Sequence, residues 1–170
     1  MKNELLDRLR SCRNPKICVL GIGSEFKADD AAGVIIAQQL QTKLEDKSCG
    51  FASSVLCIDG STAPENFTGD IKKFGTTHLF IIDAAEMGEK PGTVKLIPTD
   101  KVGGVSFSTH VLPIAVMINY LKQSINFESI IIGIEPQDFE FGNPMTKDVK
   151  EGVDKLTNTI FETIGSCLDK

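Results

Sequence analysis

The sequence predicts a three-layer α/β/α sandwich around an about five-stranded, mostly parallel sheet with one antiparallel strand at an edge. Three observations support this prediction: short apolar runs typical of covered strands, helix-like stretches between them, and one connection too short for a parallel crossover. With 170 residues, the chain is long enough to bury a core, and we expect residues 1–170 to form a single domain.

Four short runs are rich in β-branched residues and apolar on both faces, as strands are when helices cover both sides of a parallel sheet. They span residues 16–22, 53–59, 77–83 and 129–134. We therefore expect these runs to be the parallel strands of the sheet.

Helix-like stretches lie between and after these runs, at residues 30–44, 64–74, 110–125 and 146–168. The last has apolar side chains at steps of three or four, which marks one buried face; they are Val149, Val153, Leu156, Ile160 and Ile164. Three leucines near the start (Leu5, Leu6 and Leu9) indicate an extra N-terminal helix within residues 1–15.

Residues 93–97 break this alternation, because only about nine residues separate them from the preceding strand, whereas a parallel crossover needs about a dozen or more. We predict that they run antiparallel to that strand and lie at an edge of the sheet.

Composition excludes several classes of function. A net charge of −5 argues against a nucleic-acid partner held through its phosphates. The apolar runs are too short to span a membrane, and the first residues do not form a secretory signal, so we expect a cytoplasmic protein without membrane insertion. Five cysteines without a C-x-x-C pair disfavour a cysteine metal site, and we expect Cys18 and Cys57 to be buried thiols.

Acidic residues follow the predicted parallel strands, at the edge of the sheet where ligands of α/β proteins bind. Asp29 and Asp30 follow the first strand, Asp59 and Asp83 end the next two, and Glu135 follows the last.

The two histidines are placed differently. His110 opens the helix that leads into the last strand, so it is expected at the same edge as the acids. His78 begins a strand and is expected at the opposite end.

Each of these residues also has a structural explanation. Asp29 is placed to cap a helix, Asp59 to organise a turn, and a lone histidine is more often structural than a ligand. The convergence of Asp30, Asp83 and His110 carries the functional hypothesis, because two carboxylates and an imidazole suit a first-row divalent metal.

Other chemistries lack their motifs. The sequence contains no H-E-x-x-H, G-x-S-x-G or Walker A motif, and Phe26 occupies the position of the third glycine in the dinucleotide-binding pattern. The acid pair would also repel a pyrophosphate. We expect the glycines of "GIGSEFKADDAAG" (residues 21–33) to bring the backbone close to a cationic ligand.

Several blocks, in order, resemble the [NiFe] hydrogenase maturation proteases: "GIGSEFKADDAAG", "DGSTAPEN", "LFIIDAAEMGEKPGTVKLI", "FSTHVLPI" and "GIEPQDFEFGNPMT". The wording of the second and third blocks is most similar to the branch serving hydrogenase 3 of formate hydrogenlyase. Proteins of this family remove a C-terminal peptide from the hydrogenase large-subunit precursor.

The resemblance implies that Asp30, Asp83 and His110 contact nickel carried by that precursor and so act as metal ligands and catalytic residues. No other cofactor is implied, and a monomer is expected. Two alternatives stay open: a non-catalytic nickel-binding accessory or chaperone of hydrogenase assembly, and a peptidase of broader range on the same scaffold.

Overall fold

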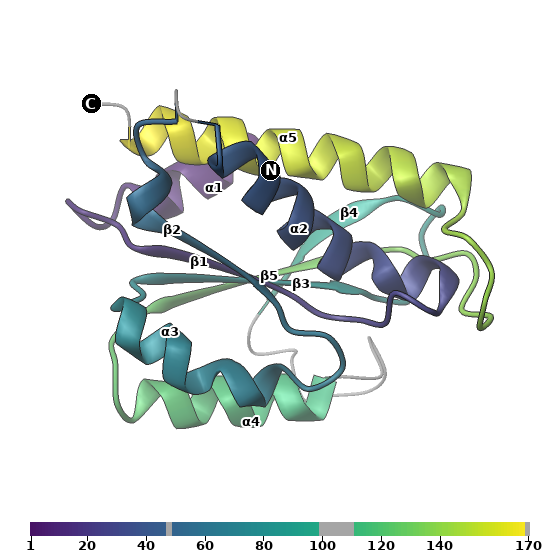
Figure 1. The fold of residues 1–170 in the computed structure, drawn as a ribbon, viewed down its shortest axis with the longest axis horizontal. Coiled ribbons are helices and arrows are strands. Elements are labelled where there is room, and N and C mark those ends of the chain that lie inside the picture. Colours follow the sequence, from purple (N-terminus) through teal and green to yellow (C-terminus); the bar gives the residue numbers. More distant parts are fainter. Residues whose placement is uncertain (47–48, 99–110, 169–170) are drawn as a thin grey trace.

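The computed structural model describes residues 1–46, 49–98 and 111–168, with the side chains of residues 111–113 left undescribed. It contains the predicted mixed sheet, in the strand order β2-β1-β3-β5-β4 (Figure 1). The four parallel strands are β1 (Ile17–Gly21), β2 (Val55–Asp59), β3 (His78–Ala84) and β5 (Glu128–Ile134).

Strand β4 (Val94–Ile97) confirms the predicted reversal of direction. It pairs antiparallel with β5, from Val94 opposite Ile134 to Ile97 opposite Ile131, and it forms one edge of the sheet. Its hydrogen-bonding partner is therefore β5 rather than the strand that precedes it in the sequence.

Helices cover both faces of the sheet (Figure 1). The helices α1 (Lys2–Leu9), α2 (Ala32–Leu44) and α5 (Lys147–Leu168) share one hydrophobic core with alternate residues of the central strands. The helices α3 (Thr68–Phe74) and α4 (Val111–Lys122) pack on the other face. This arrangement explains why the central strands are apolar on both sides.

Three short 3₁₀ turns complete the described elements: η1 (Ala28–Ala31), η2 (Ala52–Ser54) and η3 (Pro64–Phe67). Two of them form the first turns of stretches that the sequence predicts as single helices, because η1 leads into α2 and η3 into α3.

The terminal helices are integral to the core. The five predicted apolar residues of α5 are all buried, which confirms the helical periodicity. In α1, Leu5 and Leu9 are fully buried, and the helix packs against α5. Arg8 also forms an ion pair with Glu128 at the start of β5. The N-terminal segment therefore adds a helix to one layer of the sandwich.

Within the described residues, no helix is both long enough and apolar enough to cross a membrane.

Candidate active site

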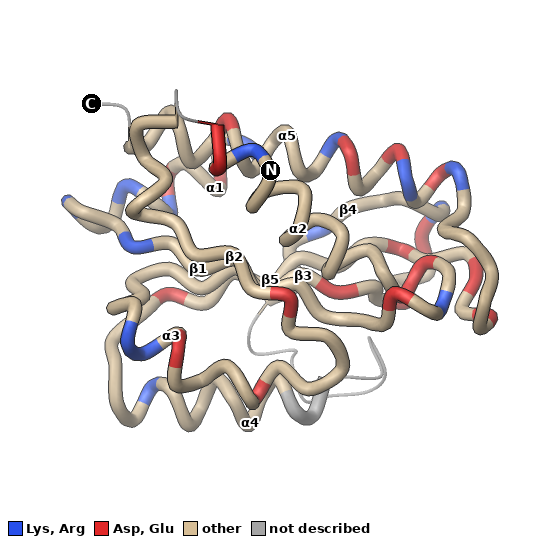
Figure 2. The backbone as a smooth tube through the Cα atoms, in the orientation of Figure 1, with Lys and Arg blue, Asp and Glu red and all other residues tan. Residues whose placement is uncertain are grey.

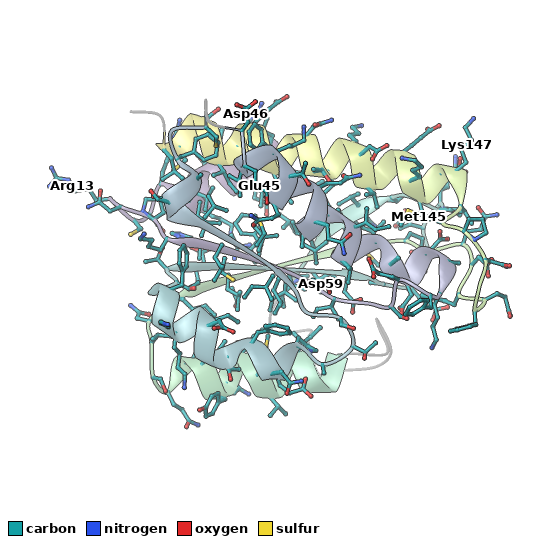
Figure 3. The ribbon with its side chains drawn as sticks, in the orientation of Figure 1. Arg13, Glu45, Asp46, Asp59, Met145 and Lys147 are labelled. Atoms are coloured by element: carbon teal, nitrogen blue, oxygen red, sulfur yellow. The ribbon has the colours of Figure 1, made fainter. Side chains whose placement is uncertain are left out.

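The four parallel strands end at one edge of the sheet, which we call the carboxyl edge. From β1 the chain crosses to β2 on one side, whereas the strands that follow β3 lie on its other side. Strand order therefore reverses between β1 and β3, and in open α/β sheets such a reversal opens a ligand-binding crevice at the carboxyl edge. Figure 2 shows acidic residues gathered at this end, and Figure 3 shows Asp59 at the end of β2.

Asp30 follows β1 within η1, and only 6% of it is exposed. Its Oδ2 accepts a hydrogen bond of 2.9 Å from the backbone nitrogen of Ser24. Its own backbone nitrogen donates to the carbonyl of Lys27 at 2.8 Å. Both the side chain and the backbone of Asp30 are therefore held by hydrogen bonds within the turn between β1 and α2. Because η1 contacts β3, the turn that carries Asp30 packs against the strand that carries the second predicted acid.

Glycines make this close packing possible, although their neighbours differ from our expectation. A Cβ atom on Gly23 would lie 1.7 Å from the carbonyl oxygen of Asp30, and one on Gly33 would lie 2.1 Å from that of Ile82. Gly23 also has a φ of +133°, a backbone conformation that residues with a side chain rarely adopt. These glycines allow close contact between two parts of the backbone. That contact accounts for them without a ligand, whereas we expected them to bring the backbone close to a ligand.

Asp83 lies in β3, where it pairs with Gly133 of β5, and it is 3% exposed. Alternate residues of a strand share a face, so Asp83 lies on the face of Leu79 and Ile81, which pack in the core below α3 and α4. The carboxylate is therefore placed on the α4 side of the sheet, close to its carboxyl edge.

His110 lies outside the described residues, so its part in the site stays a prediction. The structure shows that α4 begins at Val111, the next residue. Within the described residues, no group of three or more histidine, cysteine, aspartate or glutamate side chains has the arrangement of a metal site. Asp30 and Asp83 are the two predicted ligands that the structure describes.

Asp29 has a structural role, but it does not cap α2, the helix that follows it in the sequence. Its carboxylate is fully buried and accepts hydrogen bonds from the backbone nitrogens of Gln137, Asp138 and Thr146 at 2.7–2.9 Å. The Thr146 hydroxyl adds contacts of 3.0 Å to both oxygens. This carboxylate joins the turn after β1 to the segment between β5 and α5.

Two further acids of the carboxyl edge also organise loops. Asp59 accepts a hydrogen bond from the backbone nitrogen of Ser61 at 3.0 Å, which confirms the turn-forming interpretation. Glu135, 7% exposed, accepts from the backbone nitrogens of Met87 and Glu89. The sequence places Glu135 at this edge but contains no indication that it orders the loop after β3.

His78 lies at the opposite end of the sheet, as predicted, because β3 begins there. It is buried beside Ser11, Thr77 and Glu128. Burial lowers the pKa of His78, while nearby Glu128 acts to raise it. His78 therefore has a packing role at the end of the sheet opposite the carboxyl edge.

The two cysteines in strands, Cys18 and Cys57, are unsuited to a nucleophilic role. All five are free thiols. Burial raises the pKa of Cys18 far above its usual range, and burial raises the pKa of Cys57 to about 12, so both remain protonated at neutral pH. Cys57 is only half-buried, contrary to expectation, because β2 forms an edge of the sheet.

Comparison with known proteins identifies the family. A family model described as hydrogenase maturation protease matches residues 34–163. The chain belongs to the hydrogenase maturation protease family. Asp83 and His110 lie within the matched range, and Asp30 lies four positions before it.

Individual members of the family are similar over most of their length. The Escherichia coli K12 hydrogenase 3 maturation protease is 33% identical over 141 residues, which cover 81% of this chain and 84% of that protein. A Methanocaldococcus jannaschii protein named for the same activity is 41% identical over 165 residues, with 96% of each chain covered.

Solved structures agree with the fold. The [NiFe] hydrogenase maturation protease HycI from Thermococcus kodakarensis superposes with a TM-score of 0.81 at 26% identity, covering 98% of this chain and 99% of that one. The E. coli endopeptidase HycI superposes with a TM-score of 0.72 at 29% identity, covering 88% and 92%. The chain therefore has the fold of the hydrogenase maturation proteases.

Proposed function

We propose that this protein is an endopeptidase that removes the C-terminal extension from the nickel-loaded large-subunit precursor of a [NiFe] hydrogenase. One observation carries the proposal: in a hydrogenase maturation protease, two buried carboxylates lie where strand order reverses, Asp30 in the turn that follows β1 and Asp83 near the end of the adjacent strand β3. In open α/β sheets ligands bind at this position, which favours a function for the two acids.

The donor set fits a divalent first-row metal. Carboxylate oxygens and an imidazole nitrogen are suitable ligands for Ni²⁺, and Asp30, Asp83 and His110 would supply them. In this proposal nickel arrives with the precursor as part of the substrate, and these side chains complete its coordination. Cleavage then depends on metal insertion, because the correct substrate completes the active site.

In this proposal the two aspartates orient the attacking water. The Ser24 amide fixes one oxygen of Asp30, and pairing within the sheet fixes the backbone of Asp83. A carboxylate held in this way orients a water molecule and accepts its proton as the water attacks the scissile carbonyl, and it returns that proton to the departing amine nitrogen as the peptide C–N bond breaks. Bound metal would add polarisation of that carbonyl or of the water.

The test follows the mass of a purified precursor with and without nickel. We expect cleavage of the nickel-loaded precursor alone, and a loss of at least about 100-fold in rate with Asp30→Asn, Asp83→Asn or His110→Ala. Asp59→Asn is the matched control, because asparagine also supports its turn, and it should retain activity.

Three results would contradict parts of the proposal. Equal cleavage without nickel removes the metal check but leaves the protease activity. Stable binding to the precursor without any loss of mass supports the accessory, non-catalytic alternative instead. Cleavage of unrelated peptides would indicate the broader peptidase.

A further inference from the structure

Two exposed phenylalanines form an aromatic pair at the carboxyl edge. Phe26 is 68% exposed and Phe141 is 75% exposed, and their rings stack with centroids 6.2 Å apart and an interplanar angle of 29°. Phe139, two residues away, is 39% exposed. Apolar groups that cluster on a surface, unlike single exposed ones, mark places where a partner binds.

The loops that carry the aromatic pair are fixed to each other. Phe141 forms an antiparallel bridge with Lys27, and the backbone nitrogen of Gly142 donates to the carbonyl of Phe26 at 2.8 Å. Asp29 then ties both loops together through the backbone of Gln137 and Asp138. The rings are therefore held in place before any partner arrives, which lowers the entropic cost of binding.

The aromatic pair adjoins the proposed active site. Phe26 lies within the turn that is closed by the hydrogen bond from Ser24 to Asp30, four positions before that acid. A substrate segment that contacts the rings would thus pass directly beside the carboxylate that we assign to the chemistry.

Acidic side chains surround the aromatic pair. Glu25 precedes Phe26, and Glu140 lies between Phe139 and Phe141, with both carboxylates exposed. Hydrogen bonds from Asn143 and from the backbone of Glu140 lower the pKa of nearby Asp138, so this carboxyl is ionised at neutral pH. Glu25, Asp138 and Glu140 outnumber Lys27 in these two loops, and an excess of negative charge attracts a positively charged partner.

We propose that the aromatic pair is a docking surface for the hydrogenase precursor, and that it receives a segment with an apolar side chain next to lysine or arginine. This inference rests on the proposed function and adds a substrate-recognition element outside the metal ligands. The rings contribute the contact area, and Glu25 and Glu140 favour basic neighbours and accelerate association.

The test compares Phe26→Ser/Phe141→Ser with the parent chain, using nickel-loaded precursor. We expect KM to rise about tenfold or more, as for removal of aromatic hot spots, with kcat at saturating precursor within about twofold. Tyr120→Ser is the matched control, because Tyr120 is an exposed aromatic residue on α4; it should change neither value. Thermal unfolding checks the fold, which should survive because exposed rings leave no cavity when removed.

Charge is tested with Glu25→Gln/Glu140→Gln. The rate at which this variant associates with the precursor should be severalfold below that of the parent at low salt. Near 1 M salt the two rates should match, because the Debye length is then only about 3 Å. An equal salt dependence in the variant and the parent would overturn the assigned basic partner.

Binding is also measured without turnover, by the dissociation constant for the precursor in an Asp83→Asn background. An unchanged dissociation constant in the Phe26→Ser/Phe141→Ser chain overturns the docking surface even if cleavage proceeds. If the parent cleaves no precursor, the proposed function fails, while this measurement still decides the docking surface. A parent dimer that the serine changes convert to monomer would show that a second copy covers the rings, and would also overturn the proposal.

Discussion

The Oδ1 atom of Asp29 lies 2.7 Å from the backbone nitrogen of Thr146, 117 positions later in the chain. Thr146 directly precedes α5, and its carbonyl accepts the helical hydrogen bond from Lys150, so the carboxylate stands at the helix N-terminus, where negative charge is favourable. Asp30, the next residue, makes a different contact, with Ser24. Two adjacent acids of the same type thus have separate roles, one in structure and one in the proposed chemistry.

We expect Asp29→Ala to lower the free energy of unfolding by about 3 kcal/mol or more, because several buried backbone donors lose their acceptor. Asp29→Asn should have an intermediate effect, since one oxygen is retained while the new amide faces donors. Asp30→Asn is the neighbouring control and should cost less than about 1 kcal/mol, because asparagine can still accept from Ser24. Urea unfolding measures all three, and equal losses at both positions would contradict the division of roles.

Gly33→Ala should destabilise the fold by about 3 kcal/mol or more, near the upper end of overpacking effects. The new Cβ would lie 2.1 Å and 2.5 Å from the carbonyl oxygens of Ile82 and Ile22, so α2 would have to move away from the sheet.

The control for Gly33 is Gly69→Ala in α3, where no atom outside the neighbouring backbone of the same helix lies within 4 Å of the added carbon. This change should be neutral or stabilise the protein by up to about 1 kcal/mol, because alanine loses less conformational freedom in a helix. Thermal unfolding of both variants decides the matter, and similar melting temperatures would refute the close helix–strand contact.

Thiol reactivity should follow burial. Burial raises the pKa of Cys57 to about 12 and that of Cys18 still further, so iodoacetamide at neutral pH should leave both unmodified in the folded protein. Cys12 and Cys49, which are partly exposed, should react first. Peptide mapping by mass spectrometry gives the order, and early labelling of Cys18 would show that the core opens more readily than the structure indicates. Cys57→Ser should retain precursor cleavage.

The layers of the fold can be predicted from the sequence because they depend on local periodicity. The spacing of Val149, Val153 and Leu156 identifies the buried face of α5, and the short connection before Val94 indicates an antiparallel strand. Strand order cannot be predicted in this way, because the pairing of β1 with β3 joins segments that are far apart in the chain. For the same reason the exposure of Cys57 was not predicted, since an edge strand looks like a central one in sequence.

The candidate site was predictable only in outline. The carboxyl-edge rule brings Asp30 and Asp83 together from their positions after strands, and the structure places both there. The contacts of Asp29 and Glu135 are with backbone amides of distant loops, which no spacing rule indicates. Stacking of Phe26 on Phe141 joins two loops in the same way. The place of His110 remains a prediction.

His78 should make the protein less stable as the pH falls from about 7.5 to about 5.5. Burial lowers the pKa of His78 in the folded state, whereas the pKa of a histidine in the unfolded chain is about 6.5. Between these two values the unfolded state binds more protons, so the free energy of unfolding decreases with falling pH, by at most about 1.4 kcal/mol per pH unit for one group. Glu128, 4.0 Å away and paired with Arg8, moderates the effect without reversing it.

His78→Gln removes the titrating group, and the unfolding free energy of this variant should vary less over this pH range than that of the parent. Urea unfolding of both chains at several pH values makes the comparison. Parallel pH profiles would mean that the imidazole is hydrated enough to protonate in the folded state, contrary to its burial at the base of β3.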